Sequence, residues 1–157
     1  MPVSKDEFRA ALGHFAASVA VLTTKTTEGR HAGITVTAFT SLSLDPPLVL
    51  VCIDKRAKLH SQLQVGRAFA VNFLAADQET LSRRFASSHG EQFDGVGFQE
   101  GSLGVPLLND VLTAIECQTV DLHDGGDHTI VVGQVESTHL GHGKPLVYFR
   151  GGYAGLA

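Results

Sequence analysis

Five hydroxyl residues lie close together in the stretch GITVTAFTSLSLDPPLVLVCID, residues 33–54: Thr35, Thr37, Thr40, Ser41 and Ser43. A site for a flat polar heterocycle needs small or apolar groups against the ring faces and hydrogen-bonding groups along the ring edge. Hydroxyl groups beside basic side chains also suit a phosphate. The stretch is therefore either part of such a binding site or a solvent-facing strand rich in Thr and Ser that ends in a turn.

Five of the 12 Lys and Arg residues fall in two short groups: Lys55, Arg56 and Lys58, and then Arg83 and Arg84. The first group directly follows the apolar run 48–53, so it is expected in a loop at the end of a strand. Where such a loop opens a helix, the N-terminal N–H groups of the helix add to the cations and attract an anion. The groups are either an anion site or two solvated basic turns.

His128 follows Gly126-Asp127 and opens a predicted strand. Histidine is the side chain that changes charge near neutral pH. At the start of a strand beside a turn, His128 could hydrogen-bond a substrate or supply a proton. The alternative is a polar residue of a hairpin.

Several other kinds of site are not indicated. Gly95-Val96-Gly97 does not complete a dinucleotide-binding fingerprint, because Glu100 stands where the final glycine is required. The chain has no Gly-x-Ser-x-Gly nucleophile motif. His139 and His142 lack the spacing of a helical metal pair, and Cys52 and Cys117 have no CxxC neighbour. We expect no metal site and two buried, reduced thiols.

Strands predominate among the elements that must position these residues. β-Branched and alternating patterns predict strands at 19–24, from 31 onward, at 48–53, 68–74 and 145–149, and a long hairpin formed by 114–123 and 128–139. A capping box at Ser4 and Glu7 predicts a helix over 5–17 whose apolar face covers the end of a barrel. A short helix is expected at 58–65, and another, capped by Asp77, contains Leu81 and Phe85. Residues 87–101 form a long loop with four glycines.

About six or seven strands and three helices without regular βαβ alternation favour a mainly β fold, a β-barrel with a few flanking helices. A length of 157 residues suits one domain spanning 1–157. The net charge of −4 argues against a nucleic-acid partner. No apolar run approaches the roughly 20 residues of a membrane span, and MPVSKDEF lacks the apolar region of a signal peptide. We therefore expect a cytoplasmic protein without a membrane partner.

Six segments, in order and covering nearly the whole chain, resemble the flavin reductase-like family: FRAALGHFAASVAVLTT, GITVTAFTSLSLDPPLVLVCID, RAFAVNFLA, LSRRFA, GDHTIVVGQV and PLVYFRGGY. This family comprises the small reductase components of two-component flavin monooxygenases. The resemblance implies an FMN-binding split barrel of Greek-key type and a homodimer with flavin near the subunit boundary. It also implies that NADH or NADPH reduces FMN or FAD, and that the reduced flavin passes to a separate oxygenase.

The resemblance also implies site residues, motif by motif. The cofactor-binding residues would be Thr35, Val36, Thr37, Ser41, Leu42, Ser43, Asp54, Lys55, Ala57, Lys58, Leu59, Phe85 and Ala86. The nicotinamide nucleotide would contact His128, Ser41 and Tyr153, with His128 as the catalytic candidate. The loop 56–59 departs from the family pattern, because it lacks the two small hydroxyl residues often found there. The choice between FMN and FAD therefore stays open.

Three alternatives compete with a reductase. One is a flavin- or haem-binding split-barrel protein without catalytic activity. A second is a flavin oxidase acting on a phosphorylated pyridoxine-like substrate, which needs a richer phosphate clamp than this chain shows. The third is a purely structural barrel, in which the hydroxyl row and the basic loop would have no use.

Overall fold

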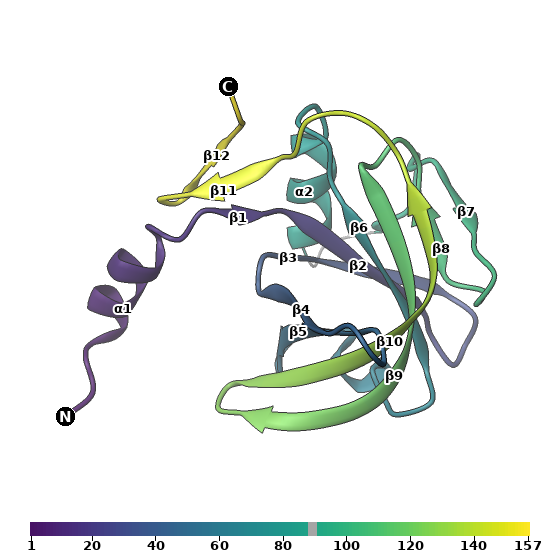
Figure 1. Ribbon diagram of the computed structural model, residues 1–157, viewed down its shortest axis with the longest axis horizontal. Coiled ribbons are helices and arrows are strands. Elements are labelled where there is room, and N and C mark those ends of the chain that lie inside the picture. The colour runs from purple at the N-terminus through teal and green to yellow at the C-terminus, as the bar shows by residue number, and fades with distance from the viewer. Residues whose placement is uncertain (88–90) are drawn as a thin grey trace.

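A seven-stranded antiparallel sheet forms the centre of the computed structural model, which describes residues 1–87 and 91–157 (Figure 1). In spatial order its strands are β3 (His31–Val36), β2 (Ala20–Lys25), β6 (Ala68–Phe73), β9 (Thr113–Gly125), β10 (His128–Leu140), β5 (Leu48–Asp54) and β4 (Phe39–Ser43). The edge strands β3 and β4 are consecutive in the chain and are joined only by residues 37–38. The sheet must therefore curve until its two edges approach at this end.

The sheet is open along the rest of its edges, since no ladder pairs β3 with β4 in the described part of the chain. Two small sheets flank it. β1 (Ala17–Ser18), β11 (Val147–Phe149) and β12 (Gly152–Ala154) form one, and β7 (Phe98–Glu100) pairs with β8 (Pro106–Leu108) in the other. The mainly β fold is confirmed. The expected loop at 87–101 contains β7, and its residues 88–90 lie outside the described residues.

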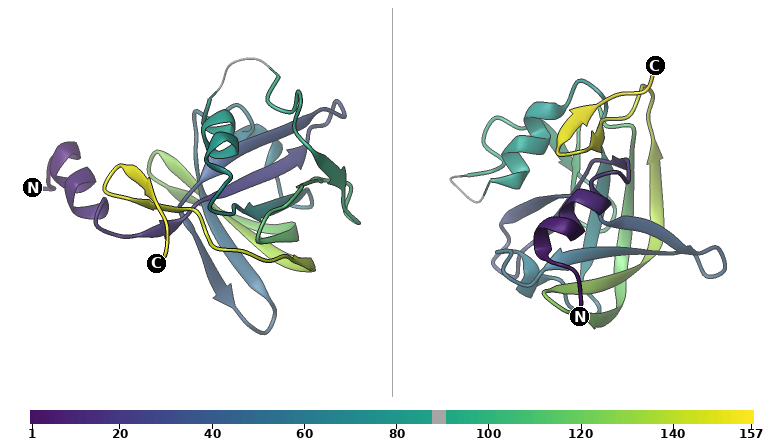
Figure 2. Two further views of the ribbon diagram at one scale, coloured as in Figure 1. Left: turned by 90° about the horizontal axis from the view of Figure 1, so that it is seen from above. Right: turned by 90° about the vertical axis from the view of Figure 1, so that its left-hand side faces the viewer.

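The helices are shorter than the sequence suggests. Helix α1 (Lys5–Leu12) begins with the predicted capping box but ends at Gly13, before the expected residue 17. Its apolar residues cover nothing: Phe8 and Leu12 are 58% and 52% exposed, and Phe15 beyond it is 73% exposed. Figures 1 and 2 show α1 lying away from the central sheet. The expectation that it covers a barrel end is wrong for this single chain.

The other two predicted helices are also corrected. The segment expected as a helix at 58–65 forms only a 3-10 turn, η1 (His60–Gln62). Helix α2 (Glu79–Ala86) starts after Gln78 and not after Asp77, and no side chain caps it. Gln78 is held by other bonds, because its Oε1 accepts from the Ala75 N–H at 2.8 Å and its Nε2 donates to the Asn109 carbonyl at 3.0 Å. None of the helices in the described ranges is long and apolar enough to cross a bilayer.

One carboxylate, Glu116 of β9, is fully buried. It accepts hydrogen bonds from the Leu103 N–H at 2.8 Å and the Ser102 hydroxyl at 3.2 Å, and it lies 2.8 Å from Nε2 of His139. Burial acts to raise the pKa of Glu116, but these hydrogen bonds outweigh it and hold the pKa below its usual value. The buried charge therefore ties segment 102–103 to the sheet.

Both cysteines are free, as predicted. Cys117 is buried in the core, and burial raises the pKa of its thiol to about 12, so it stays protonated. Cys52 is only partly buried, so the expectation of a buried thiol is wrong at this position.

Candidate functional site

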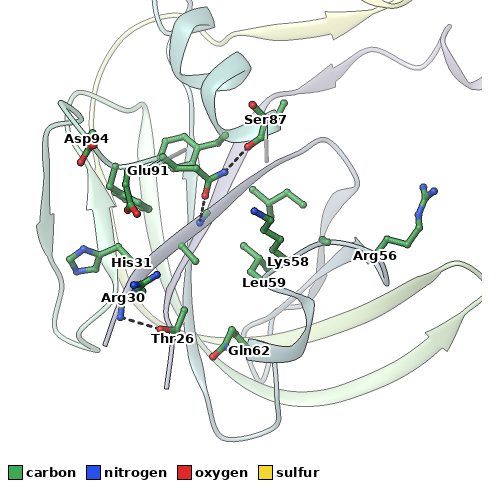
Figure 3. A pocket seen from close by; sticks show the side chains of 18 residues that line it. Thr26, Arg30, His31, Arg56, Lys58, Leu59, Gln62, Ser87, Glu91 and Asp94 are labelled. Carbon is green, nitrogen blue, oxygen red and sulfur yellow. Dashed lines mark hydrogen bonds between the residues drawn. The ribbon is translucent and has the colours of Figure 1, made fainter. Parts of the chain in front are cut away.

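A cavity of about 860 Å³ lies between β3, the C-terminal end of α2, and the segments 56–62 and 91–94 (Figure 3). Five of the predicted cofactor residues line it: Ala57, Lys58, Leu59, Phe85 and Ala86. Leu59 and Phe85 are almost completely buried, so they shape the wall by packing rather than by presenting exposed surface. The volume falls within the range usual for small-molecule sites.

Two contacts fix α2 against β3. The Thr35 hydroxyl donates to the Ser82 carbonyl at 2.6 Å. Gly33 leaves room for the Phe85 ring, because a Cβ at Gly33 would lie 2.8 Å from Cδ1 of Phe85. The end of α2 thus rests directly on the strand that carries the first part of the hydroxyl row.

A second cavity, of about 260 Å³, lies on the other side of Ala86, which lines both. Four further predicted residues line it: Thr35, Val36, Thr37 and Tyr153. The Tyr153 hydroxyl lies 2.7 Å from the Ser82 hydroxyl, and the guanidinium of Arg83 sits 5.0 Å from the centre of the Tyr153 ring. The structure thereby brings nine of the predicted residues to two adjoining cavities along β3.

The basic loop contributes fewer free cations than its sequence suggests. Arg56 bonds Asp54 through Nε (3.2 Å to Oδ1) and Nη2 (3.0 Å to Oδ2), and Figure 3 shows its side chain pointing away from the cavity. These bonds from Arg56 lower the pKa of Asp54 to about 2. Lys55 forms an ion pair with Asp124. Lys58 of this loop lines the larger cavity.

His128 is the first residue of β10 and pairs in register with Asp54 of β5. Its Nδ1 lies 2.7 Å from Oδ1 of Asp127, and this bond to His128 lowers the pKa of Asp127. Because an ionised carboxylate only accepts, we assign the Nδ1 proton to His128 and leave Nε2 available for another partner. His128 lines neither cavity, so its role stays a prediction.

Five other predicted residues also lie outside both cavities: Ser41, Leu42, Ser43, Asp54 and Lys55. The first three belong to the edge strand β4, where Leu42 is 49% exposed. Their assignment to a cofactor stays a prediction.

The sequence analysis missed the opposite wall of the larger cavity, formed by Thr26, Arg30, His31, Gln62, Gln92 and Phe93. Arg30 is a lone basic residue after a turn, and Phe93 lies in the glycine-rich loop. Neither belongs to a motif. A signal for Arg30 exists in the first hairpin, because its register places the start of β3 beside the turn at 27–29.

Residues 12–157 match the flavin reductase like domain. The chain belongs to the flavin reductase-like family. It is 43% identical over 150 residues to an NADH-dependent flavin reductase of a Rhodococcus species, covering 94% of this chain and 84% of the relative. It is 42% identical to the reductase component of 4-hydroxyphenylacetate 3-monooxygenase of Thermus thermophilus, covering 97% of each.

A solved structure of the same family has a very similar fold. The NADH:FAD oxidoreductase SgcE6 of Streptomyces globisporus, in complex with NAD and FAD fragments, superposes with a TM-score of 0.93 at 35% identity, covering 98% of this chain and 93% of that one. The resemblance stated from the six sequence segments is therefore confirmed.

The residues at the two cavities fit the flavin expected for a flavin reductase-like protein. The smaller cavity combines the rings of Tyr148 and Tyr153 with the hydroxyls of Thr35 and Thr37, which suits a flat ring with a polar edge. The larger cavity places Lys58 beside the end of α2, which suits a phosphate. Ala86 lines both cavities, so the two adjoin.

Proposed function

We propose that this chain is an NAD(P)H:flavin oxidoreductase. It would transfer hydride from NADH or NADPH to FMN or FAD and supply the reduced flavin to a separate flavin-dependent monooxygenase. The observation that carries the proposal is the pair of adjoining cavities along β3, one with aromatic and hydroxyl groups and one with a lysine. The names of the Rhodococcus and Thermus relatives support the reaction and the monooxygenase partner.

The flavin supplies the redox chemistry, because it accepts two electrons as a hydride. The protein itself then has to bind the flavin and the nicotinamide nucleotide and orient them toward each other. Thr37 would donate to the ring edge, and Thr35, whose hydroxyl proton is bonded to the Ser82 carbonyl, could only accept there. Tyr153 would cover one side of the smaller cavity, and Lys58 would bind the phosphate.

In this proposal His128 orients the nicotinamide nucleotide through Nε2, while Asp127 holds Nδ1. Replacing His128 with Ala should lower kcat/KM for NADH by about tenfold, the loss of roughly one hydrogen bond. The dissociation constant for flavin, measured by fluorescence titration, should change less than about twofold. Loss of flavin affinity with unchanged NADH kinetics would show that this role is wrong.

The activity itself is tested by recording the visible spectrum and then assaying NADH and NADPH oxidation with FMN, FAD and riboflavin. A protein that oxidises neither nucleotide with any flavin would refute the reductase. If such a protein still bound flavin or haem, the non-catalytic split-barrel alternative would be supported.

We further propose that residues 1–157 form one FMN-binding split barrel of Greek-key type, that the protein is cytoplasmic, and that it is a homodimer. The exposed apolar face of α1 supports the dimer, because Phe8, Leu12 and Phe15 have no cover in a single chain. A second copy would bury these side chains.

A further inference from the structure

We propose that Ser82 is a positioning residue, whose hydroxyl donates to the Tyr153 phenol oxygen and thereby leaves the Tyr153 O–H to donate into the smaller cavity. Ser82 belongs to α2 and Tyr153 to β12, and their hydroxyl oxygens lie 2.7 Å apart. Both residues line the smaller cavity. The inference deepens the proposed function and rests on it, since it names the group that a ligand of this cavity must offer to Tyr153.

Ser82 joins three elements at the smaller cavity. Its carbonyl accepts from the Thr35 hydroxyl of β3 at 2.6 Å, and its own hydroxyl contacts Tyr153 of β12, which lies beside α2 (Figure 1). A serine inside a helix often bonds the carbonyl four residues earlier. In residues 1–87 and 91–157 the Ser82 hydroxyl makes no such bond, and the Gln78 carbonyl accepts the Ser82 N–H at 3.2 Å. The side chain is thus directed across to β12.

The direction of this hydrogen bond follows from burial. Ser82 is completely buried, and within the described part of the chain Tyr153 is the one hydrogen-bond partner of its hydroxyl. A buried hydroxyl proton without an acceptor is costly. Tyr153 is partly exposed and lines the cavity, so its own proton can reach a ligand or solvent. We therefore assign Ser82 as the donor and the Tyr153 oxygen as the acceptor.

Other contacts hold the Tyr153 ring but do not orient its hydroxyl proton. The ring packs edge-on against Tyr148, its partner in the β11–β12 ladder, with 5.5 Å between the ring centres. The Arg83 guanidinium lies 5.0 Å from the centre of the Tyr153 ring. A phenol held in this way can still rotate its O–H. The bond from Ser82 selects the orientation in which the O–H points away from Ser82 and is left for a group in the cavity.

Tyr153 and Thr35 then offer complementary groups to one ligand edge. Tyr153 is a donor, while the Thr35 hydroxyl, whose proton is bonded to the Ser82 carbonyl, is an acceptor. A carbonyl next to an N–H satisfies both. The flavin ring carries such an imide edge, and nicotinamide carries a carboxamide with the same two groups. The smaller cavity therefore suits an amide or imide edge.

The test measures ligand binding to flavin-free protein for Ser82→Ala, Tyr153→Phe and the double variant. Riboflavin is titrated by fluorescence and nicotinamide mononucleotide by calorimetry, because each carries one of the two edges. Each single variant should weaken the ligand that binds here about fivefold, the loss of roughly one hydrogen bond. The double variant should bind no more weakly than Tyr153→Phe alone, since Ser82 acts through the Tyr153 hydroxyl.

Two measurements separate this positioning from a merely structural role. Thr24→Val is the matched control, because Thr24 is fully buried, donates to the Ala68 carbonyl at 2.8 Å and lines none of the described cavities. It should lower stability in urea but change either affinity less than about twofold. In infrared difference spectra of the bound ligand with isotope-labelled carbonyls, the carbonyl stretch should move to higher frequency in Ser82→Ala and in Tyr153→Phe, and stay in place in Thr24→Val.

The two ligands identify the source of the edge. A response of riboflavin alone assigns the cavity to the flavin imide, and a response of nicotinamide mononucleotide alone assigns it to the carboxamide. Wild-type affinity of Ser82→Ala for both ligands, additive losses in the double variant, or a carbonyl stretch that does not move would overturn the role of Ser82. The proposed function fails in a different way, through absence of NADH and NADPH oxidation with any flavin, and the binding results for Ser82 stand without turnover.

Discussion

Gly33 is the position where a small change should disturb the proposed flavin site most directly. A Cβ added there would lie 2.8 and 2.9 Å from Cδ1 and Cε1 of Phe85, and 3.3 Å from the Leu22 carbonyl oxygen. The ring cannot turn aside freely, because Phe85 is 1% exposed and packs against Phe93. Gly33→Ala should therefore destabilise the protein by about 1–3 kcal/mol, the usual cost of overpacking.

The disturbance should also reach the ligand. Phe85 precedes Ala86, the residue shared by both cavities, so a displaced ring shifts the end of α2. We expect flavin affinity to fall about tenfold, which corresponds to about 1.4 kcal/mol. Phe85→Leu removes the crowded ring atoms, and in that background Gly33→Ala should cost at least about 1 kcal/mol less than it does alone.

Urea denaturation of the flavin-free protein and fluorescence titration of the four members of this cycle measure both effects. Gly155→Ala is the matched control, because a Cβ at Gly155 meets no atom within 4 Å. Additive costs in the cycle, or a Gly33→Ala protein with wild-type stability and affinity, would refute the steric argument.

Two further predictions concern stability and assembly. Glu116→Gln should destabilise by about 1–3 kcal/mol at neutral pH. The pKa of Glu116 is lowered on folding, so its contribution is present above the ordinary glutamate pKa and is lost as pH falls through the lower pKa of the folded state. The difference in stability from wild type, measured by urea denaturation, should therefore shrink as the pH is lowered below the ordinary glutamate pKa; a difference independent of pH would contradict this. Replacing both Phe8 and Phe15 with Ser should shift a dimer toward monomer in light scattering at matched concentration. An unchanged mass, with Lys5→Ala as the control, would remove α1 from the interface.

The strands were predictable because their patterns are local. The β9–β10 hairpin was expected at 114–123 and 128–139; the structure adds one residue at the start of β9, two at its end, and one at the end of β10, which starts at His128 as expected. The helices were less predictable, because their ends depend on what they pack against. The apolar spacing predicted that the first helix continues past Gly13 to residue 17, but α1 ends at Leu12 with Gly13 as its C-cap, and its apolar side chains stay largely exposed within the described residues.

The site was predictable where contiguous residues share one wall, as at 35–37, 57–59 and 85–86. The opposite wall of the larger cavity was not predictable, because Arg30 and Phe93 are far apart in sequence. They come together only when the Gln92 segment is bonded to β3 and α2. The ion pairs of the basic loop could not be predicted from the sequence either. The sequence shows three cations at 55–58, but not that Asp124 and Asp54 neutralise two of them.

That neutralisation bears on which side chains hold the flavin phosphate. In loop 56–59 the small hydroxyl residues are missing, and Arg56 is committed to Asp54. Lys58 is the side chain of this loop that lines the larger cavity beside Ala57 and Leu59. Arg30 lines the same cavity. Lys58 and Arg30 are therefore the two cations whose removal should weaken binding of a flavin phosphate, whichever flavin binds.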